Sequence, residues 1–247
     1  MSAPGPMIRL RQPVIATSQL DRVVELLQSR LGLGVSHRVE DAPSHAEFGL
    51  RAAHLPVGEQ FIEVVEPCQT DVPVARHRQR LGGDGGYMVI LHVPSLAAAK
   101  QRVLDQGARI VWEGGDAVRA IHLHPRDTGG ILLSLAEDRL GDEWEQAGKG
   151  WRAHVRTDVV TSISRADIAC LDPGQCVETW SRLLGIGRQG TDGLTLQLAD
   201  GRLRFVQAVG QPHGPSGLAL RAAAPVDPGP VIKIGNLDIS LVSEVDA

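Results

Sequence analysis

The chain has 247 residues, 43% of them hydrophobic and 22% charged, which predicts an ordinary globular core and excludes a disordered chain, a coiled coil or collagen. Lys and Arg number 25 against 29 Asp and Glu, for a net charge of −4, and the basic residues are scattered rather than gathered into the stripe of a nucleic-acid binder. No apolar run approaches the roughly 20 residues of a membrane span. The three cysteines lack metal-type spacing, and the first residues lack signal-peptide features. We therefore expect a cytoplasmic protein without nucleic-acid or membrane partners.

The first predicted unit is a strand, a helix and two further strands. Residues 10–17 are apolar enough for a strand, and Gly32 and Gly34 would end the helix that follows. Short strands are expected near 47–51 and 60–66. The helix is predicted because five aliphatic residues recur at the spacing of one helical face: Leu20, Val23, Val24, Leu27 and Leu31.

The same order of elements recurs twice along the chain. A second unit is expected to begin with a strand at 87–93 and a helix ending at Gly107, followed by strands near 109–113, 119–124 and 131–136. A third unit is expected to begin with a strand at 166–171 and a helix from Pro173, followed by strands near 194–198 and 203–208.

The constant spacing of these units indicates an internal repeat. Met88 lies 76 residues after Gln12, and Arg165 lies 77 residues after Met88. Such self-similarity is the signature of a repeated supersecondary unit. A fourth copy should begin after Ala208, but the sequence there offers only a short strand, a turn-rich break and a hairpin at 231–242. The fourth unit is therefore predicted to be degenerate.

These units predict an α+β fold of tandem βαβββ modules. The charged stretch that carries Trp144 and Trp151 is interpreted as a linker, the alternative being one domain with a long insertion. The expected division is an N-terminal domain at 8–138 with modules 8–68 and 85–138, a linker at 139–158, and a degenerate C-terminal domain at 159–247.

Three segments of the N-terminal half resemble one family. Residues 124–135, His-Pro-Arg-Asp-Thr-Gly-Gly-Ile-Leu-Leu-Ser-Leu, are similar to the His-Pro-Lys-Asp-Thr-Gly-Gly-Val-Leu-Val-Glu-Leu segment of methylmalonyl-CoA epimerases. Residues 61–67 and 86–93 resemble two further strands of those proteins. Residues 8–138 thus resemble the vicinal oxygen chelate superfamily of glyoxalases, epimerases and extradiol dioxygenases, and within it the methylmalonyl-CoA epimerase-like domains.

The resemblance implies a cup with four metal-ligand positions on its inner strands. This sequence has Gln12, Glu63, Met88 and Ser134 there, where the family has His, Glu or Gln, His and Glu. Only Glu63 is a good ligand for a divalent ion. Because a catalytic metal normally takes about three strong protein ligands, we expect neither a metal nor another cofactor. In the third unit Arg165 occupies the matching position, so no metal is expected in the C-terminal domain either.

Two histidines are candidates for the inner face of the same cup. Residues two apart on a strand share a face, so His92 lies on the side of Met88, and His122 replaces an inward-facing Phe of the epimerase pattern. Three interpretations of these histidines remain. They could be buried, hydrogen-bonded residues, they could form a metal-free acid–base group that titrates near neutral pH, or they could form a displaced metal site together with Glu63. The remaining histidines outside the 124–135 segment are predicted to lie at the surface: His37, His45, His54, His77, His154 and His213.

The function expected is binding of, or chemistry on, a small carbonyl-containing organic acid or acyl thioester. In an isomerase, epimerase or lyase, Glu63 would be the base and His122 or His92 the partner acid. Gln12, Met88 and Ser134 would contact the substrate, with hydrogen bonds to an enolate oxygen in place of a metal. The alternatives are a non-catalytic binding or resistance protein and a metal-dependent epimerase or dioxygenase with displaced ligands. The sequence leaves open whether the chain is an enzyme, and a homodimer is compatible with it.

Overall fold

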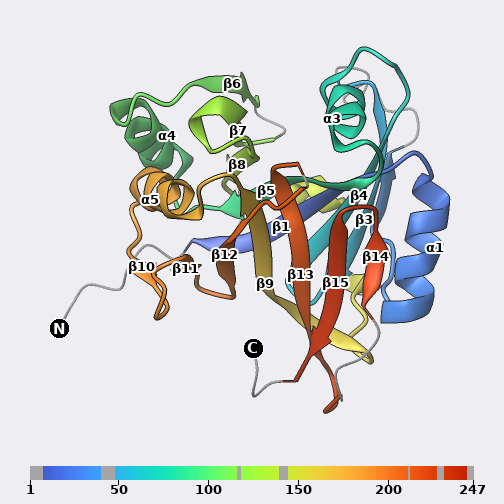
Figure 1. Cartoon of the computed structure of the whole chain (residues 1–247). Coiled ribbons are helices and arrows are strands. Elements are labelled where there is room, and N and C mark those ends of the chain that lie inside the picture. Colours follow the sequence, from blue (N-terminus) through green and yellow to red (C-terminus); the bar gives the residue numbers. More distant parts are fainter. Residues whose placement is uncertain are drawn as a thin grey trace.

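The computed structural model describes residues 8–39, 48–115, 118–138, 144–210, 212–226 and 231–243. Within these ranges the chain forms two mixed β-sheets and few helices, and both sheets are built from βαβββ modules (Figure 1). The predicted α+β fold of tandem modules is thereby confirmed. None of the described helices is long and apolar enough to cross a membrane. His45 and the first residues of the expected linker, 139–143, lie outside the described residues.

The first sheet joins two modules through their first strands. Its strand order is β2-β3-β4-β1-β5-β8-β7-β6, with β1 parallel to β4 and antiparallel to β5, and β5 parallel to β8. Phe48 precedes β3 yet touches Trp112 of β6 at the opposite edge, with ring centroids 5.5 Å apart, so the sheet curves into a cup. The strands are β1 Arg9–Ala16, β2 His37–Val39, β3 Leu50–Val57, β4 Gln60–Pro67, β5 Gly85–His92, β6 Ile110–Glu113, β7 Ala120–Leu123 and β8 Leu132–Ala136.

The second sheet repeats this arrangement, with one α-helix in its described residues. Its order is β10-β11-β12-β9-β13-β15-β14, and β9 is again parallel to the last strand of its own module and antiparallel to β13. Between β13 and β14 the described residues, 223–226 and 231, form no helix, as expected for a degenerate fourth module. The strands are β9 Val160–Cys170, β10 Arg188–Gln189, β11 Thr195–Gln197, β12 Arg202–Gln207, β13 Gly214–Ala222, β14 Ile232–Ile234 and β15 Leu237–Val242.

Four α-helices accompany the sheets in the described part of the chain. The five aliphatic residues that predict the first helix are the buried residues of α1, which ends at Gly32 with a left-handed φ of 67°. The sequence gives no periodic signal for α3, because Val74 is its one buried residue, and this helix was not expected. The bounds are α1 Leu20–Leu31, α3 Pro73–Leu81, α4 Leu96–Asp105 and α5 Pro173–Leu184.

The position predicted for the strand near 47–51 is wrong. β3 spans Leu50–Val57 and therefore includes Pro56, a residue that argues against a central strand. The proline is tolerated because the pairing of β3 with β2 ends at His54, so Pro56 lies where β3 is an edge strand.

One apolar core unites the two sheets. A single buried cluster contains residues of β1, β4, β9 and β13 together with α1, α4 and α5. The side-chain amide of Gln60 on β4 bonds both backbone groups of Ile163 on β9, at 2.9 Å to the carbonyl oxygen and 2.6 Å from the amide nitrogen. Trp180 of α5 donates its indole N–H to the carbonyl oxygen of Thr128, between β7 and β8, at 3.0 Å. The sheets are thus held by hydrogen bonds as well as by apolar packing.

Candidate functional site

A second buried cluster lies on the other face of the first sheet, inside the cup. It contains Phe61 and Val65 of β4, whereas Ile62 and Val64 belong to the core shared with the second sheet. Glu63 therefore projects into the cup. The same alternation places Met88 and Ser134 on this face, so the positions inherited from the family resemblance are brought to one surface.

Glu63 is held by hydrogen bonding at the inner surface of the cup. Its side chain is 12% exposed. One oxygen, Oε2, accepts a hydrogen bond of 2.7 Å from Nε2 of Gln12, and the other, Oε1, lies 3.6 Å from Nε2 of His54. Gln12 is fully buried, and its Oε1 accepts a hydrogen bond of 2.5 Å from the indole nitrogen of Trp144.

His54 is a residue of this site that sequence reasoning missed, because it was predicted to lie at the surface. It is 2% exposed and is the direct partner of Glu63 in the β3–β4 pairing. Burial and, to a smaller extent, the charge of His37 lower the pKa of His54 to about 3, so its contact with Glu63 is not an ion pair at neutral pH. A strand predicted over Leu50–Val57 would have placed His54 in the cup, because His54 lies two residues after the inward-facing Ala52 and therefore shares its face.

His77, also predicted to be exposed, is partly buried near the open end of the cup. Its Nε2 lies 2.8 Å from the carbonyl oxygen of Gly86, and its ring centroid is 5.0 Å from that of Tyr87. Burial and the negative charge of Glu63 raise the pKa of Tyr87 to about 12. Tyr87 therefore keeps its proton at neutral pH and is a neutral donor on the Glu63 side of the cup.

Ser134 and His122 are neighbours on the opposite side of the cup. They are paired residues of β8 and β7. Ser134 is fully buried, and its hydroxyl oxygen has no hydrogen-bond partner among the described residues. His122 packs against Trp112 with ring centroids 4.4 Å apart, and burial lowers its pKa to about 4. His122 is therefore neutral at physiological pH.

His92 lies apart from His122, although both face the cup. It is at the end of β5, with Nε2 3.6 Å from Oδ2 of Asp138 and its ring centroid 6.5 Å from that of Trp144. In the register of β5, β8 and β7, the residue level with His122 is Ile90, one inward position away from His92. The two histidines thus belong to different parts of the cup.

The segment expected to be a linker packs inside one end of the cup. Trp144 and Trp151, which are 2% and 0% exposed, belong to the inner cluster. A bulge in β1 beside Gln12 leaves Arg11 out of the pairing with β5, and the Arg11 guanidinium lies 5.0 Å and 5.8 Å from the two indole rings and 5.4 Å from Phe61. Residues 144–155, including the turns Glu145–Ala147 and Trp151–His154, therefore line the cup as well as connect the two sheets.

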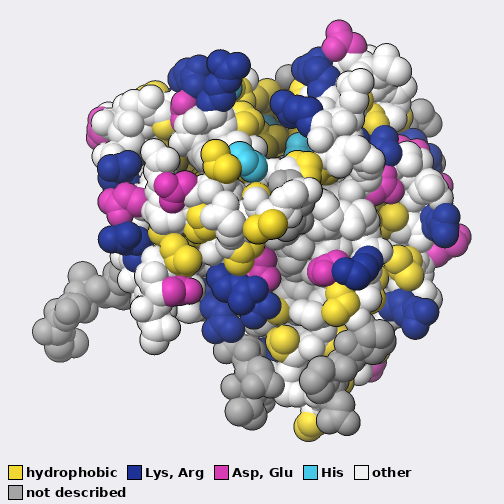
Figure 2. Space-filling view, viewed as in Figure 1, with side chains coloured by type: hydrophobic (Ala, Val, Ile, Leu, Met, Phe, Trp, Pro, Cys, Tyr) yellow, Lys and Arg dark blue, Asp and Glu magenta, His cyan; other side chains and the backbone are white. Residues whose placement is uncertain are grey.

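The other end of the cup is open. Strand direction puts the start of β5 and the end of β4 there, beside α3. Figure 2 shows the molecule hollowed on this side, between α3 and the β6–β7 hairpin, with hydrophobic side chains in the hollow and Lys or Arg on both sides of it. This opening is the exposed end of the cup, because the tryptophans occupy the far end.

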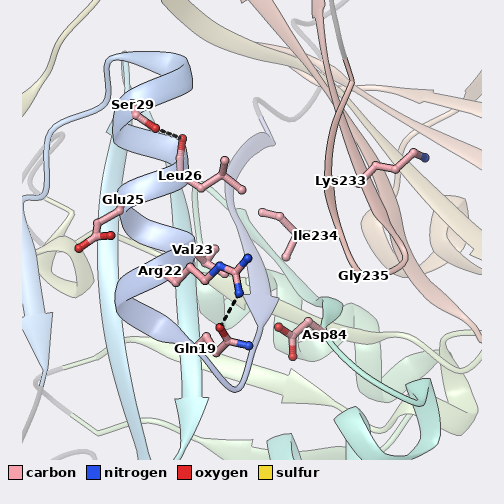
Figure 3. Close-up of a pocket in the computed structure, with 10 residues that line it drawn as sticks. All are labelled: Gln19, Arg22, Val23, Glu25, Leu26, Ser29, Asp84, Lys233, Ile234 and Gly235. Atoms are coloured by element: carbon pink, nitrogen blue, oxygen red, sulfur yellow. Dashed lines mark hydrogen bonds between the residues drawn. The ribbon is translucent and has the colours of Figure 1, made fainter.

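A separate groove of about 580 Å³ lies between α1 and β14 (Figure 3). Val23 and Leu26 of α1 face Ile234 of β14 across it. Two charged groups that line it are bonded to neighbours: Lys233 to Asp238, and Asp84 to Thr17, Ser18 and Arg78. Arg22, which bonds Gln19, and Glu25 also line the groove.

The inner positions of the cup do not fit the divalent metal that the family resemblance implies. Glu63 offers a carboxylate, but Met88 offers a thioether suited to soft metals and Ser134 a neutral hydroxyl. The oxygen of Gln12, the one atom of that side chain able to bind a cation, accepts the Trp144 hydrogen bond. No group of three or more His, Cys, Asp or Glu side chains suited to a metal occurs in the described part of the chain.

Comparison with known proteins identifies the family. Residues 13–184 match the family described as glyoxalase-like domain. The chain belongs to this glyoxalase-like family. Human mitochondrial methylmalonyl-CoA epimerase is 28% identical to this glyoxalase-like protein over 133 residues, which cover 52% of the chain and 73% of the relative. The ethylmalonyl-CoA/methylmalonyl-CoA epimerase of Cereibacter sphaeroides is 25% identical over 134 residues, which cover 52% of the chain and 97% of the relative.

A solved structure extends the likeness in fold to nearly the whole chain. The crystal structure of a hypothetical protein from Staphylococcus aureus superposes with a TM-score of 0.73 over 96% of this glyoxalase-like chain and 99% of its own, at 13% identity. At that identity the likeness shows the fold alone: the tandem arrangement of the two sheets occurs in another protein.

His54 and His122 predict a loss of stability in mild acid. Their folded-state pKa values, about 3 for His54 and about 4 for His122, lie below the usual value of 6.5, so between these pH values the unfolded chain binds more protons. The free energy of unfolding should therefore be highest above pH 6.5 and fall as the pH drops toward 4. Urea unfolding at pH 7 and pH 5 measures this difference. His54→Gln and His122→Gln should each reduce it.

Proposed function

We propose that the N-terminal cup binds a small carbonyl-containing acid or acyl thioester and that Glu63 removes the proton α to the carbonyl. The observation that carries the proposal is the placement of Glu63, whose carboxylate faces the cup, is 12% exposed, and is bonded on one oxygen by Gln12. The hydrogen bond from Gln12 fixes the orientation of the carboxylate toward the cup, where it accepts the substrate proton. A positioned base of this kind contributes about 10²- to 10⁴-fold to the rate.

Ser134 supports the second half of this chemistry. When Glu63 takes the proton, the C–H bond breaks and its electron pair moves toward the carbonyl oxygen, which becomes an enolate oxygen. A buried hydroxyl without a partner costs about 1–3 kcal/mol, and the Ser134 hydroxyl is in this condition. A substrate oxygen bound there accepts its hydrogen bond, and such a donor is worth about 3–4 kcal/mol in the transition state.

The two histidines take different roles in this proposal. His122 is neutral at pH 7 because of its low pKa, so it serves as a hydrogen-bond donor beside Ser134 rather than as the acid that returns the proton. His92, next to Asp138, stays the candidate for the partner acid. Return of a proton from Glu63 gives exchange at the α carbon, and return from the opposite face gives the epimer.

The names of the relatives support the acyl thioester as ligand class. Both matched proteins are named as epimerases of malonyl-CoA derivatives. The proposal does not need a metal, because hydrogen bonds from Ser134 and His122 replace its electrostatic role.

The proposal predicts metal-independent exchange of the α-proton. Protein treated with EDTA and dialysed should still exchange the α-proton of methylmalonyl-CoA in D₂O, as followed by ¹H NMR, and added Zn²⁺ or Co²⁺ should not raise the rate. Exchange that requires a metal would instead indicate a metalloenzyme with displaced ligands. Saturable binding of methylmalonyl-CoA without any exchange would indicate a binding protein.

Arginines of α3 at the open end should favour ligands with phosphate groups. Arg76 and Arg80 lie near enough to Tyr87 for their charges to act on its pKa, and both are exposed. Replacing both with Ala should raise the Kd for methylmalonyl-CoA roughly five- to thirtyfold, because each exposed ion pair is worth up to about 1 kcal/mol. The N-acetylcysteamine thioester of methylmalonate has no phosphates, so its Kd should not change. Arg22→Ala, on α1, is the control, and equal losses for both ligands would contradict the assignment.

A further inference from the structure

The hydrogen bonds from Trp144 through Gln12 to Glu63 can run in one direction only. An indole nitrogen donates and cannot accept, and an ionised carboxylate accepts and cannot donate. Since Trp144 donates to Oε1 of Gln12 at 2.5 Å, the amide oxygen is turned toward the indole and the amide nitrogen toward Glu63, to which it donates at 2.7 Å. The indole of Trp144 and the carboxylate of Glu63 therefore fix the Gln12 amide in one of its two possible orientations.

Burial makes the two hydrogen bonds of Gln12 hard to replace. Gln12 is 0% exposed and Trp144 is 2% exposed, so solvent does not reach either hydrogen bond. An amide held at one end only can rotate and weaken its bond to the carboxylate. An amide held at both ends cannot.

We propose that Trp144 is a positioning residue for Glu63, acting through Gln12. The segment between the two sheets is then part of the site. Its Trp144 indole N–H lies at the closed end of the cup and bonds the Gln12 amide, which in turn bonds the Glu63 carboxylate. The inference rests on the proposed function only in its consequence for the reaction, because the effect on the Glu63 carboxylate exists without substrate.

Trp151 supplies a matched control. It belongs to the same segment and the same buried cluster and also lies against Arg11. Its indole nitrogen is buried and has no hydrogen-bond partner among the described residues. Trp144→Phe and Trp151→Phe thus remove similar volumes from the closed end of the cup, but only the first removes a hydrogen bond.

The test is an NMR titration of the Glu63 carboxyl group in protein labelled with ¹³C-glutamate, without ligand. In Trp144→Phe the midpoint should shift to higher pH, toward that of Gln12→Leu, because a weaker hydrogen bond to the charged form favours protonation. In Trp151→Phe it should stay at the wild-type value. An unchanged midpoint in Trp144→Phe, or an equal shift in both variants, would overturn the proposal.

A second measurement needs no substitution. In wild-type protein labelled with ¹⁵N, the indole resonance of Trp144 should follow the titration of Glu63, and that of Trp151 should not. A Trp144 indole resonance whose chemical shift does not change as Glu63 titrates would overturn the proposal that Trp144 positions Glu63 through Gln12. If methylmalonyl-CoA exchanges its α-proton, the Trp144→Phe rate should also fall roughly two- to tenfold, the value of one neutral hydrogen bond. If it does not exchange, the two NMR titrations still test whether Trp144 positions Glu63 through Gln12.

Discussion

Glu63→Gln is expected to abolish α-proton exchange, a loss of at least about 100-fold, while the protein stays folded. The amide keeps the shape of the side chain and can accept the hydrogen bond from Gln12 through its oxygen, but it has no basic atom for the substrate proton. The measurements are exchange of the α-proton of methylmalonyl-CoA in D₂O and urea unfolding of the same sample. We expect the free energy of unfolding to change by no more than about 1 kcal/mol.

Glu66→Gln is the matched control for this substitution. Glu66 lies on the same strand, three residues on, and bonds Arg51 and the backbone nitrogen of Leu20 rather than residues of the cup. Its replacement should leave exchange unchanged. Full exchange by Glu63→Gln would remove Glu63 from the role of base, and His92 and His122 would then have to be tested as an independent pair.

Trp180→Ala should lower the free energy of unfolding by about 3–5 kcal/mol, the usual cost of emptying the place of a fully buried aromatic residue. Trp180 is 0% exposed, packs edge to face with Phe205 with ring centroids 5.4 Å apart, and donates a hydrogen bond to the Thr128 carbonyl oxygen between β7 and β8. Urea unfolding followed by circular dichroism measures the loss.

The placement of Trp180 also predicts how the two sheets unfold. Because it joins α5 to the β7–β8 connection, the transitions of both sheets should move together to lower urea. Trp180→Phe keeps most of the volume and loses the hydrogen bond, so a smaller loss of about 1–2 kcal/mol is expected. A variant in which only half of the chain unfolds earlier would contradict a shared core.

Local periodicity in the sequence predicted the repeat and the fold class, and the family resemblance predicted the inner face for Glu63. Residues at helical spacing make the buried face of α1, and the structure separates Glu63 from Ile62 and Val64 by the alternation along β4. A period of 76 or 77 residues appears in the chain whatever its partners are. The degenerate fourth unit was predicted for the same reason, since a missing helix is a missing pattern.

The surroundings of Glu63 depend on contacts between residues far apart in the sequence. His54 meets Glu63 only through the register of β3 and β4, and α3 lacks the apolar face that periodicity detects. Trp144 is 132 residues from the amide it bonds, in a charged stretch typical of a linker. Contacts of such separation leave no period in the sequence, because they depend on how the sheet curves and what fills its concave face. The pKa of His122 follows from the same burial, which lowers it to about 4 and makes a neutral donor of a side chain that the sequence had offered as an acid.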